Sequence, residues 1–387
     1  MSKQIHLKHK TPMKVKNSNR PSSIIVNYPN QPNRNIILKP SKSQIKQIKM
    51  PNKNEQNYNK TSNLETRQKV ENYIDNKKKL YKSVYKFIVF PGEGVNKKFN
   101  EKYFQKLNDV VENQGILKDC EETQQFLQII KNICDNHHRG TNFITNIFQL
   151  LQYYKNQIKQ ILSNNEIYRI FENNKILLLF LLKNDFITIS DEIYREIICK
   201  IEPNDMKFCY FFYPEIESFI GEKEMLNVKK EILMKYQNFE NYEEKRKEGQ
   251  NDSYICSLIR QDSVEEFIAF VNCSNYSLSS QISPSVFETN SFLIENKNTT
   301  LIEYAAFFGS IQIFRYLLMN GVELNHSLWI YAIHSENSEL IHLLESIQIS
   351  PPKCANNDEY EKCYFESIKC HHNDIAEYIE NNYLCQR

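Results

Sequence analysis

The stretch that decides the fold is residues 302–318, IEYAAFFGSIQIFRYLL, which has a near copy 27 residues later at 329–344, WIYAIHSENSELIHLL. Residues 255–271, ICSLIRQDSVEEFIAFV, follow the same scheme, and residues 364–379, YFESIKCHHNDIAEYI, are a weaker fourth copy. Each copy predicts a short helix, a polar turn and a second helix that ends on paired apolar residues. One such unit cannot bury its apolar face alone, so the copies predict an all-α solenoid of stacked helical hairpins.

The clearest copy resembles the ankyrin repeat, whose signature runs Thr-Pro-Leu-His-x-Ala-Ala, then Gly, Leu-Leu and Gly. The residues that carry the resemblance are TLIEYAA at 300–306, Gly309, Leu317-Leu318, Gly321 and Asn325. The sequence of this copy is similar to those of the divergent ankyrin proteins expanded in trichomonad-type protists, in which a degenerate helical half precedes the repeats.

The resemblance covers residues 250–387 well, residues 119–240 weakly and the start of the chain not at all. Leu301 stands where the motif has Pro, and Glu303 where it has His. The copies follow one another at 47, 27 and 35 residues, whereas ankyrin repeats are spaced by about 33. Residues 274–297 are a candidate for a collapsed repeat.

The resemblance implies a protein–protein interaction module or scaffold whose partner binds the concave face, formed by the first helices and the turns before them. By motif position, the expected partner-binding residues are Asn298, Glu303, Tyr304 and Phe308 in one copy, and Ile330, Tyr331 and Ser335 in the next. An exposed aromatic such as Tyr304 is a typical interface anchor. For Phe308 and Tyr331, packing between repeats is an equal alternative.

Four segments are expected along the chain. Residues 1–65 hold six of the 12 prolines and predict a disordered arm. Residues 66–118 are an uncertain linker, for which we expect a polar helix at 65–84 and a strand from Tyr85 into Pro91-Gly92. Residues 119–245 predict helical hairpins, with a break at Pro214 and a helix at 222–236. An exposed, charged connection at 241–252 then leads into the repeat domain, residues 246–387.

The net charge of +2 hides an asymmetry between the two ends of the chain. Residues 1–60 contain 13 Lys and Arg against one acid, Glu55, whereas the remainder has 36 basic and 46 acidic residues. Blocks of like charge are typical of interaction tails. The alternative function is therefore charge-driven anchoring, in which the basic arm binds an acidic polymer, a membrane surface or nucleic acid; a merely solvated tail is as good an interpretation.

No catalytic signature is present, and we expect a protein that is not an enzyme and needs no cofactor. The set Cys363, Cys370, His371 and His372 has the wrong spacing for paired zinc ligands, so no metal site is expected. We also expect ordinary packing or exposure for His334 and His342. Ten scattered cysteines without a CxxC pair, the lack of a signal-peptide pattern and a longest apolar run of seven residues predict a cytoplasmic protein without a transmembrane segment.

Overall fold

The computed structural model describes residues 58–89, 101–137, 141–202, 206–219, 230, 241–351 and 360–384. The chain divides into one unit of residues 1–66 and a second of residues 67–387. The basic arm and the helix expected at 222–236 lie outside the described residues, apart from the start of the first helix and residue 230. The described part is all-α except for a two-residue antiparallel pair, β1 (Ile201–Glu202) and β2 (Met206–Lys207).

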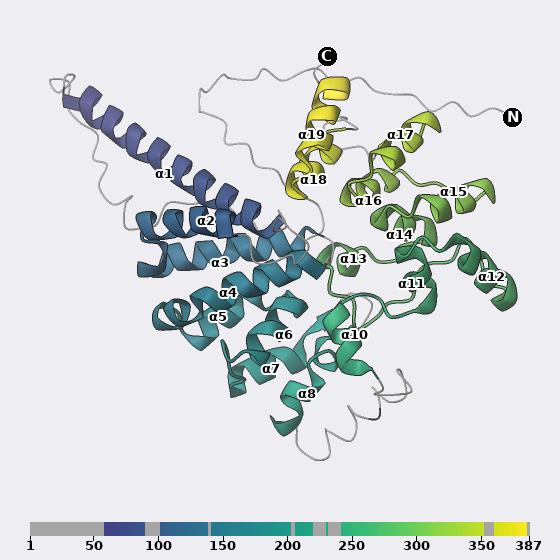
Figure 1. The fold of residues 1–387 in the computed structure, drawn as a ribbon, viewed down its shortest axis with the longest axis horizontal. Coiled ribbons are helices and arrows are strands. Elements are labelled where there is room, and N and C mark those ends of the chain that lie inside the picture. The colour runs from purple at the N-terminus through teal and green to yellow at the C-terminus, as the bar shows by residue number, and fades with distance from the viewer. Residues whose placement is uncertain are drawn as a thin grey trace, which may run out of the picture. The chain divides into compact units, whose positions relative to one another are not determined.

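The first group of helices, purple to teal in Figure 1, forms a continuous apolar core. Its members are α1 (Tyr58–Val89), α2 (Glu101–Gln114), α3 (Cys120–Asp135), α4 (Thr141–Ile161), α5 (Asn164–Phe171), α6 (Lys175–Lys183), α7 (Asp191–Cys199) and the short α8 (Tyr213–Ile216). Their starts follow from capping residues. The Asp119 side chain accepts from the Glu122 amide at the start of α3, and Ser163 with Glu166 forms a capping box at α5.

The polar helix expected at 65–84 lies within α1, but the strand expected from Tyr85 is wrong for the part that is described. Residues up to Val89 continue α1. The reason is that Leu80, Val84, Phe87 and Ile88 are all buried, and their spacing of i, i+4, i+7 and i+8 places them on one helical face. Packing of this face against the core outweighs the β-propensity of the local sequence.

The exposed connection expected at 241–252 is only partly observed, since Glu244, Lys247 and Glu248 are exposed but other residues are not. This stretch contains α10 (Tyr242–Glu248), and its Arg246 side chain is 0% exposed. The guanidinium donates to both carboxylate oxygens of Glu215 at 2.6 Å and to Glu243 at 2.6 Å. A charged side chain is buried here because it is paired, which a count of charges along the sequence does not reveal.

The second group, green to yellow in Figure 1, consists of four helical hairpins at the four sequence copies. They are α11 (Tyr254–Arg260) with α12 (Val264–Ser274), α14 (Leu301–Phe308) with α15 (Ile311–Met319), α16 (Leu328–His334) with α17 (Ser338–Ser346), and α18 (Glu361–Lys369) with α19 (Asn373–Ile379). The first helices contact one another in series, α11 to α14 to α16 to α18. The expected helix pairs are therefore present, and a second apolar core runs through them.

The turn between the two helices repeats in detail. The equivalent positions Asp262, Gly309, Glu336 and His371 all have left-handed backbone, with φ of 51°, 67°, 55° and 63°. The next residue then bonds back to the preceding hairpin in three cases, through Ser310 to the Ile259 carbonyl, Asn337 to the Gly309 carbonyl and His372 to the Ile333 carbonyl. The sequence repeat is thus a structural repeat, tied together by turn-to-carbonyl hydrogen bonds.

Between the first two hairpins, residues 275–300 contain a single short helix, α13 (Ser291–Glu295), and an isolated bridge between Gln281 and Thr300. Val286 and Phe287 of this segment pack into the first core, not the second. The stretch is therefore not a fifth hairpin.

Candidate functional site

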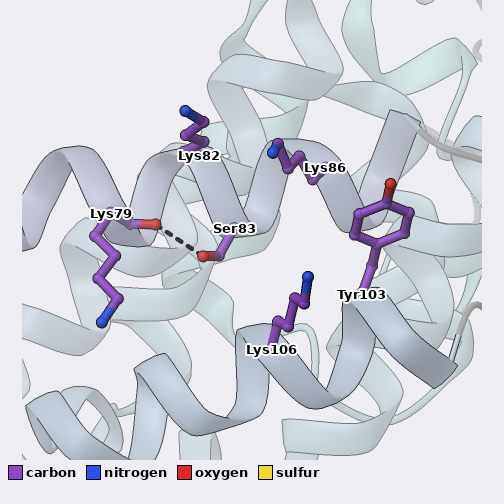
Figure 2. Close-up of a pocket in the computed structure, with 6 residues that line it drawn as sticks. All are labelled: Lys79, Lys82, Ser83, Lys86, Tyr103 and Lys106. Atoms are coloured by element: carbon purple, nitrogen blue, oxygen red, sulfur yellow. Dashed lines mark hydrogen bonds between the residues drawn. The ribbon is translucent and has the colours of Figure 1, made fainter.

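A groove of about 160 Å³ between α1 and α2 is lined almost entirely by cationic and hydroxyl-bearing side chains. The residues of this lysine groove are Lys79, Lys82, Ser83, Lys86, Tyr103 and Lys106. Figure 2 shows Lys106 rising from α2 towards α1, with Ser83 facing the space between the two helices and the Tyr103 ring beside Lys86. The groove thus presents four ammonium groups, while the Ser83 hydroxyl donates to the Lys79 carbonyl oxygen at 2.8 Å (Figure 2).

Helix geometry explains why three of these lysines share one side of α1. Lys79, Lys82 and Lys86 are spaced i, i+3 and i+7, which places them along one face over about 10 Å of helix. The opposite face carries Leu80, Val84, Phe87 and Ile88, all buried. Burial of that apolar face fixes the rotation of α1 and so directs the lysines outwards.

None of the four lysines has a carboxylate partner within the described part of the chain. Their neighbours on α1 differ in this respect, since Lys77 pairs with Glu122 and Lys78 with Asp75. Lysines that share one surface without acidic partners give it a positive potential, which attracts anions. Sequence reasoning missed this site because the fourth lysine, Lys106, comes from a different helix.

The expectation that Tyr304 is an exposed anchor is wrong. Its side chain is 0% exposed, Arg260 donates to its hydroxyl at 2.9 Å, and burial raises its pKa well above the ordinary 10.0. Ile330 and Tyr331 are buried as well, and the Tyr331 hydroxyl lies 3.0 Å from that of Thr299. For Tyr331 the packing alternative is the one observed.

The other expected partner-binding residues divide between packing and surface. Glu303 is buried and completes the capping box of α14 with Thr300, while Ser327 donates to it at 2.5 Å. Phe308 and Ser335 are half-buried, and Asn298 is exposed in a left-handed conformation with φ of 68°. Motif position therefore identified one exposed residue, Asn298, whereas most of the others are buried because the first helices of adjacent hairpins pack directly on one another.

The set Cys363, Cys370, His371 and His372 is not brought together as one ligand cluster. His371 Nδ1 lies 3.0 Å from His137 Nε2, and His372 Nδ1 lies 2.7 Å from the Ile333 carbonyl oxygen. Cys370 has different neighbours, namely His334 of α16 and Glu366 of α18. His342, by contrast, is exposed and bonds to Glu345.

Among the described residues, one group places its metal-binding atoms within 4.8 Å of one another, namely His334, Glu366 and Cys370. His334 Nε2 lies 2.9 Å from Glu366 Oε1 and 3.7 Å from Cys370 Sγ. Burial alone raises the pKa of Glu366, but the His334 hydrogen bond and the Lys369 charge outweigh it and lower that pKa to about 2. Burial also lowers the pKa of His334 and raises that of the Cys370 thiol.

Comparisons with protein-family models, with curated proteins and with solved structures found no match for this chain. Among the described residues, no helix is both long enough and apolar enough to cross a bilayer.

Proposed function

We propose that this protein is a non-enzymatic scaffold that binds a partner protein, and that the lysine groove takes an acidic segment of that partner. The observation that supports this function is the row of four lysines without carboxylate partners in the described chain. It also bears on the alternative of charge-driven anchoring, because it adds a folded cationic surface to the basic arm.

An acidic peptide segment fits the groove better than a single small anion does. Lys79, Lys82 and Lys86 extend over about 10 Å of helix, which is the length of about three residues of extended chain. Tyr103 is the one aromatic side chain in the lining. A single-stranded nucleic acid would need several such rings on which to stack its bases.

The test is fluorescence anisotropy of a labelled glutamate-rich peptide titrated with the full chain at low and moderate salt. Reversing the charge of the groove lysines to Glu is expected to abolish binding, because four attractive contacts become repulsive. The matched control reverses four exposed lysines elsewhere, at positions Lys118, Lys247, Lys297 and Lys362, and is expected to retain most of the affinity.

Two further arms separate the groove from the other candidates. Replacing the 13 basic residues of 1–60 by Gln leaves binding intact if the groove is the site, and removes it if the arm alone is responsible. Equal or tighter binding of a single-stranded oligonucleotide, or equal loss in the control variant, would argue against an acidic peptide as the ligand.

A second contact is proposed on the hairpin group, where the ankyrin resemblance places partner binding. The specific observation is an apolar pair on α18, Phe365 and Ile368, which are 57% and 42% exposed. They lie opposite the buried face of α18 that carries Cys363 and Ser367. Replacing both by Ser is expected to weaken capture of a partner by the full chain without changing its helix content, whereas unchanged capture would rule this contact out.

A further inference from the structure

We infer that His334, Glu366 and Cys370 form a binding site for a divalent transition-metal ion, with Zn²⁺ as the ion that fits best. The site lies between the third and fourth hairpins, so it is distinct from the lysine groove and does not depend on the proposed function. Two of its residues, Glu366 and Cys370, are four apart and share one face of the α18 turn. The third, His334, closes α16 of the preceding hairpin.

The distances suit one small ion. Zinc bonds nitrogen and oxygen at about 2.0–2.2 Å and sulfur at about 2.3 Å in a tetrahedral arrangement, which separates neighbouring ligand atoms by about 3.3–3.6 Å. The observed separations of 2.9 Å from His334 Nε2 to Glu366 Oε1, and 3.7 Å from Nε2 to Cys370 Sγ, bracket that range. All three ligand atoms lie within 4.8 Å of one another, so small rotations of the side chains bring them to ligand positions.

The chemistry of the set selects the class of ion. Imidazole and thiolate ligands favour Zn²⁺ and its transition-metal neighbours, whereas Mg²⁺ and Ca²⁺ require oxygen ligands. His334 and Cys370 are buried and Glu366 is 14% exposed on its side chain. Three protein ligands leave one tetrahedral position for a water molecule.

Binding requires one proton to leave. The Cys370 thiol loses its proton to solvent, so that sulfur coordinates as a thiolate. The imidazole stays neutral and coordinates through the Nε2 lone pair, with its proton on Nδ1. The Glu366 carboxylate coordinates as it stands, and the net charge of the filled site is neutral.

One cation competes with the ion for Glu366. The Lys369 ammonium lies 3.2 Å from the same oxygen, Oε1, and its side chain is 52% exposed. Because its stem is free to turn into solvent, the ammonium is displaced when an ion binds. This competition distinguishes a metal site from a purely hydrogen-bonded cluster, since Lys369→Gln should tighten metal binding to a real site.

The experiment is titration of the metal-free full chain with ZnCl₂ by calorimetry, and with Co²⁺ by absorption, which reports thiolate ligation through a near-ultraviolet charge-transfer band. The variants are Cys370→Ser, His334→Gln, Glu366→Gln and Lys369→Gln, with circular dichroism to verify helix content. The matched control is Cys363→Ser, which alters another buried cysteine of α18.

The expected result is one tight ion in the wild type and in Cys363→Ser, with the cobalt band present in both and absent in Cys370→Ser. His334→Gln and Glu366→Gln should weaken metal binding by more than about tenfold, because even the loss of a residue that only hydrogen-bonds to a ligand costs about that much. Lys369→Gln should strengthen metal binding. Equal stoichiometry and affinity in wild type and Cys370→Ser would overturn the site. If Cys370→Ser fails to fold, an unchanged affinity in both His334→Gln and Glu366→Gln would overturn it as well.

Discussion

Replacement of Arg246 is expected to produce the largest single loss of stability among the charged residues of the described chain. Its guanidinium is completely buried, forms two 2.6 Å hydrogen bonds with Glu215 and one with Glu243, and lies within 5.6 Å of the ring centres of Phe211 and Tyr242. Met is the appropriate replacement because it keeps the apolar stem and removes only the charge.

The magnitude follows from what Arg246→Met leaves behind. Glu215 is 14% exposed, so its carboxylate becomes a buried charge without a counterion, which costs about 3–5 kcal/mol. Glu243 is 47% exposed and already pairs with Lys183, so its share is at most about 1 kcal/mol. The expected loss in free energy of unfolding is therefore about 3–5 kcal/mol, nearly all of it through Glu215.

The assay is urea unfolding of the full chain followed by circular dichroism, for Arg246→Met, Glu215→Gln, the double variant and Glu243→Gln. The double variant should be more stable than Arg246→Met alone, because Gln removes the orphaned charge. Glu243→Gln should cost less than about 1 kcal/mol. A loss below about 1 kcal/mol for Arg246→Met, or a Glu243→Gln effect as large as that of Glu215→Gln, would refute the reasoning.

Two further outcomes concern the hairpin group. Gly309→Ala should destabilise the fold by more than Gly321→Ala, as measured by thermal unfolding of the two variants. Both substitutions cost about 1–2 kcal/mol, because each glycine has a left-handed backbone. Only at Gly309 would the new Cβ also meet the Asn337 side chain, at 3.3 Å. Burial would raise the pKa of Glu345, but hydrogen bonds from Tyr383, His342 and Tyr378 lower it below the ordinary 4.5. The Glu345 carboxylate therefore stabilises the fold above pH 4.5 and loses this contribution as the pH falls through the pKa of Glu345 in the folded state. Glu345→Gln should accordingly reduce the difference in stability between neutral and acid pH. An unchanged difference would contradict this prediction.

The helices were predictable wherever a local pattern was sufficient. The four hairpins follow from apolar periodicity and from turn positions such as Gly309, and each copy begins and ends within a few residues of its observed helices. The strand expected at Tyr85 was wrong because the short segment from Tyr85 does not show the helical periodicity. That periodicity is visible only over the longer stretch 80–88, in which Leu80, Val84, Phe87 and Ile88 lie on one helical face.

The burial of individual side chains was harder to predict than the formation of helices, because burial depends on contacts between segments distant in sequence. Tyr304 occupies a motif position that suggests exposure, but its hydroxyl meets Arg260 from the previous hairpin. Arg246 lies in a run of charges that suggests solvent, but Glu215, 31 residues earlier, pairs with it. In both cases the deciding partner cannot be identified without the fold.

Both candidate sites also depend on contacts between segments that are distant in sequence. The lysine groove needs Lys106 of α2 beside the lysines of α1, and the metal site needs His334 beside residues 32 and 36 positions later. The three-lysine spacing on α1 was the available sequence signal for the groove. For the metal site the sequence signal was partial, since Cys370 belongs to the local Cys-His run, but its observed neighbours His334 and Glu366 lie outside that run.

The central claim is that an acidic segment binds in the lysine groove, and hydrogen–deuterium exchange of the full chain with and without a glutamate-rich peptide tests it most directly. We expect slower exchange of amides in the second half of α1 and in α2, lost when the four groove lysines are reversed to Glu. Slower exchange confined to the hairpins of residues 254–384, or no change in either region at saturating peptide, would contradict the claim.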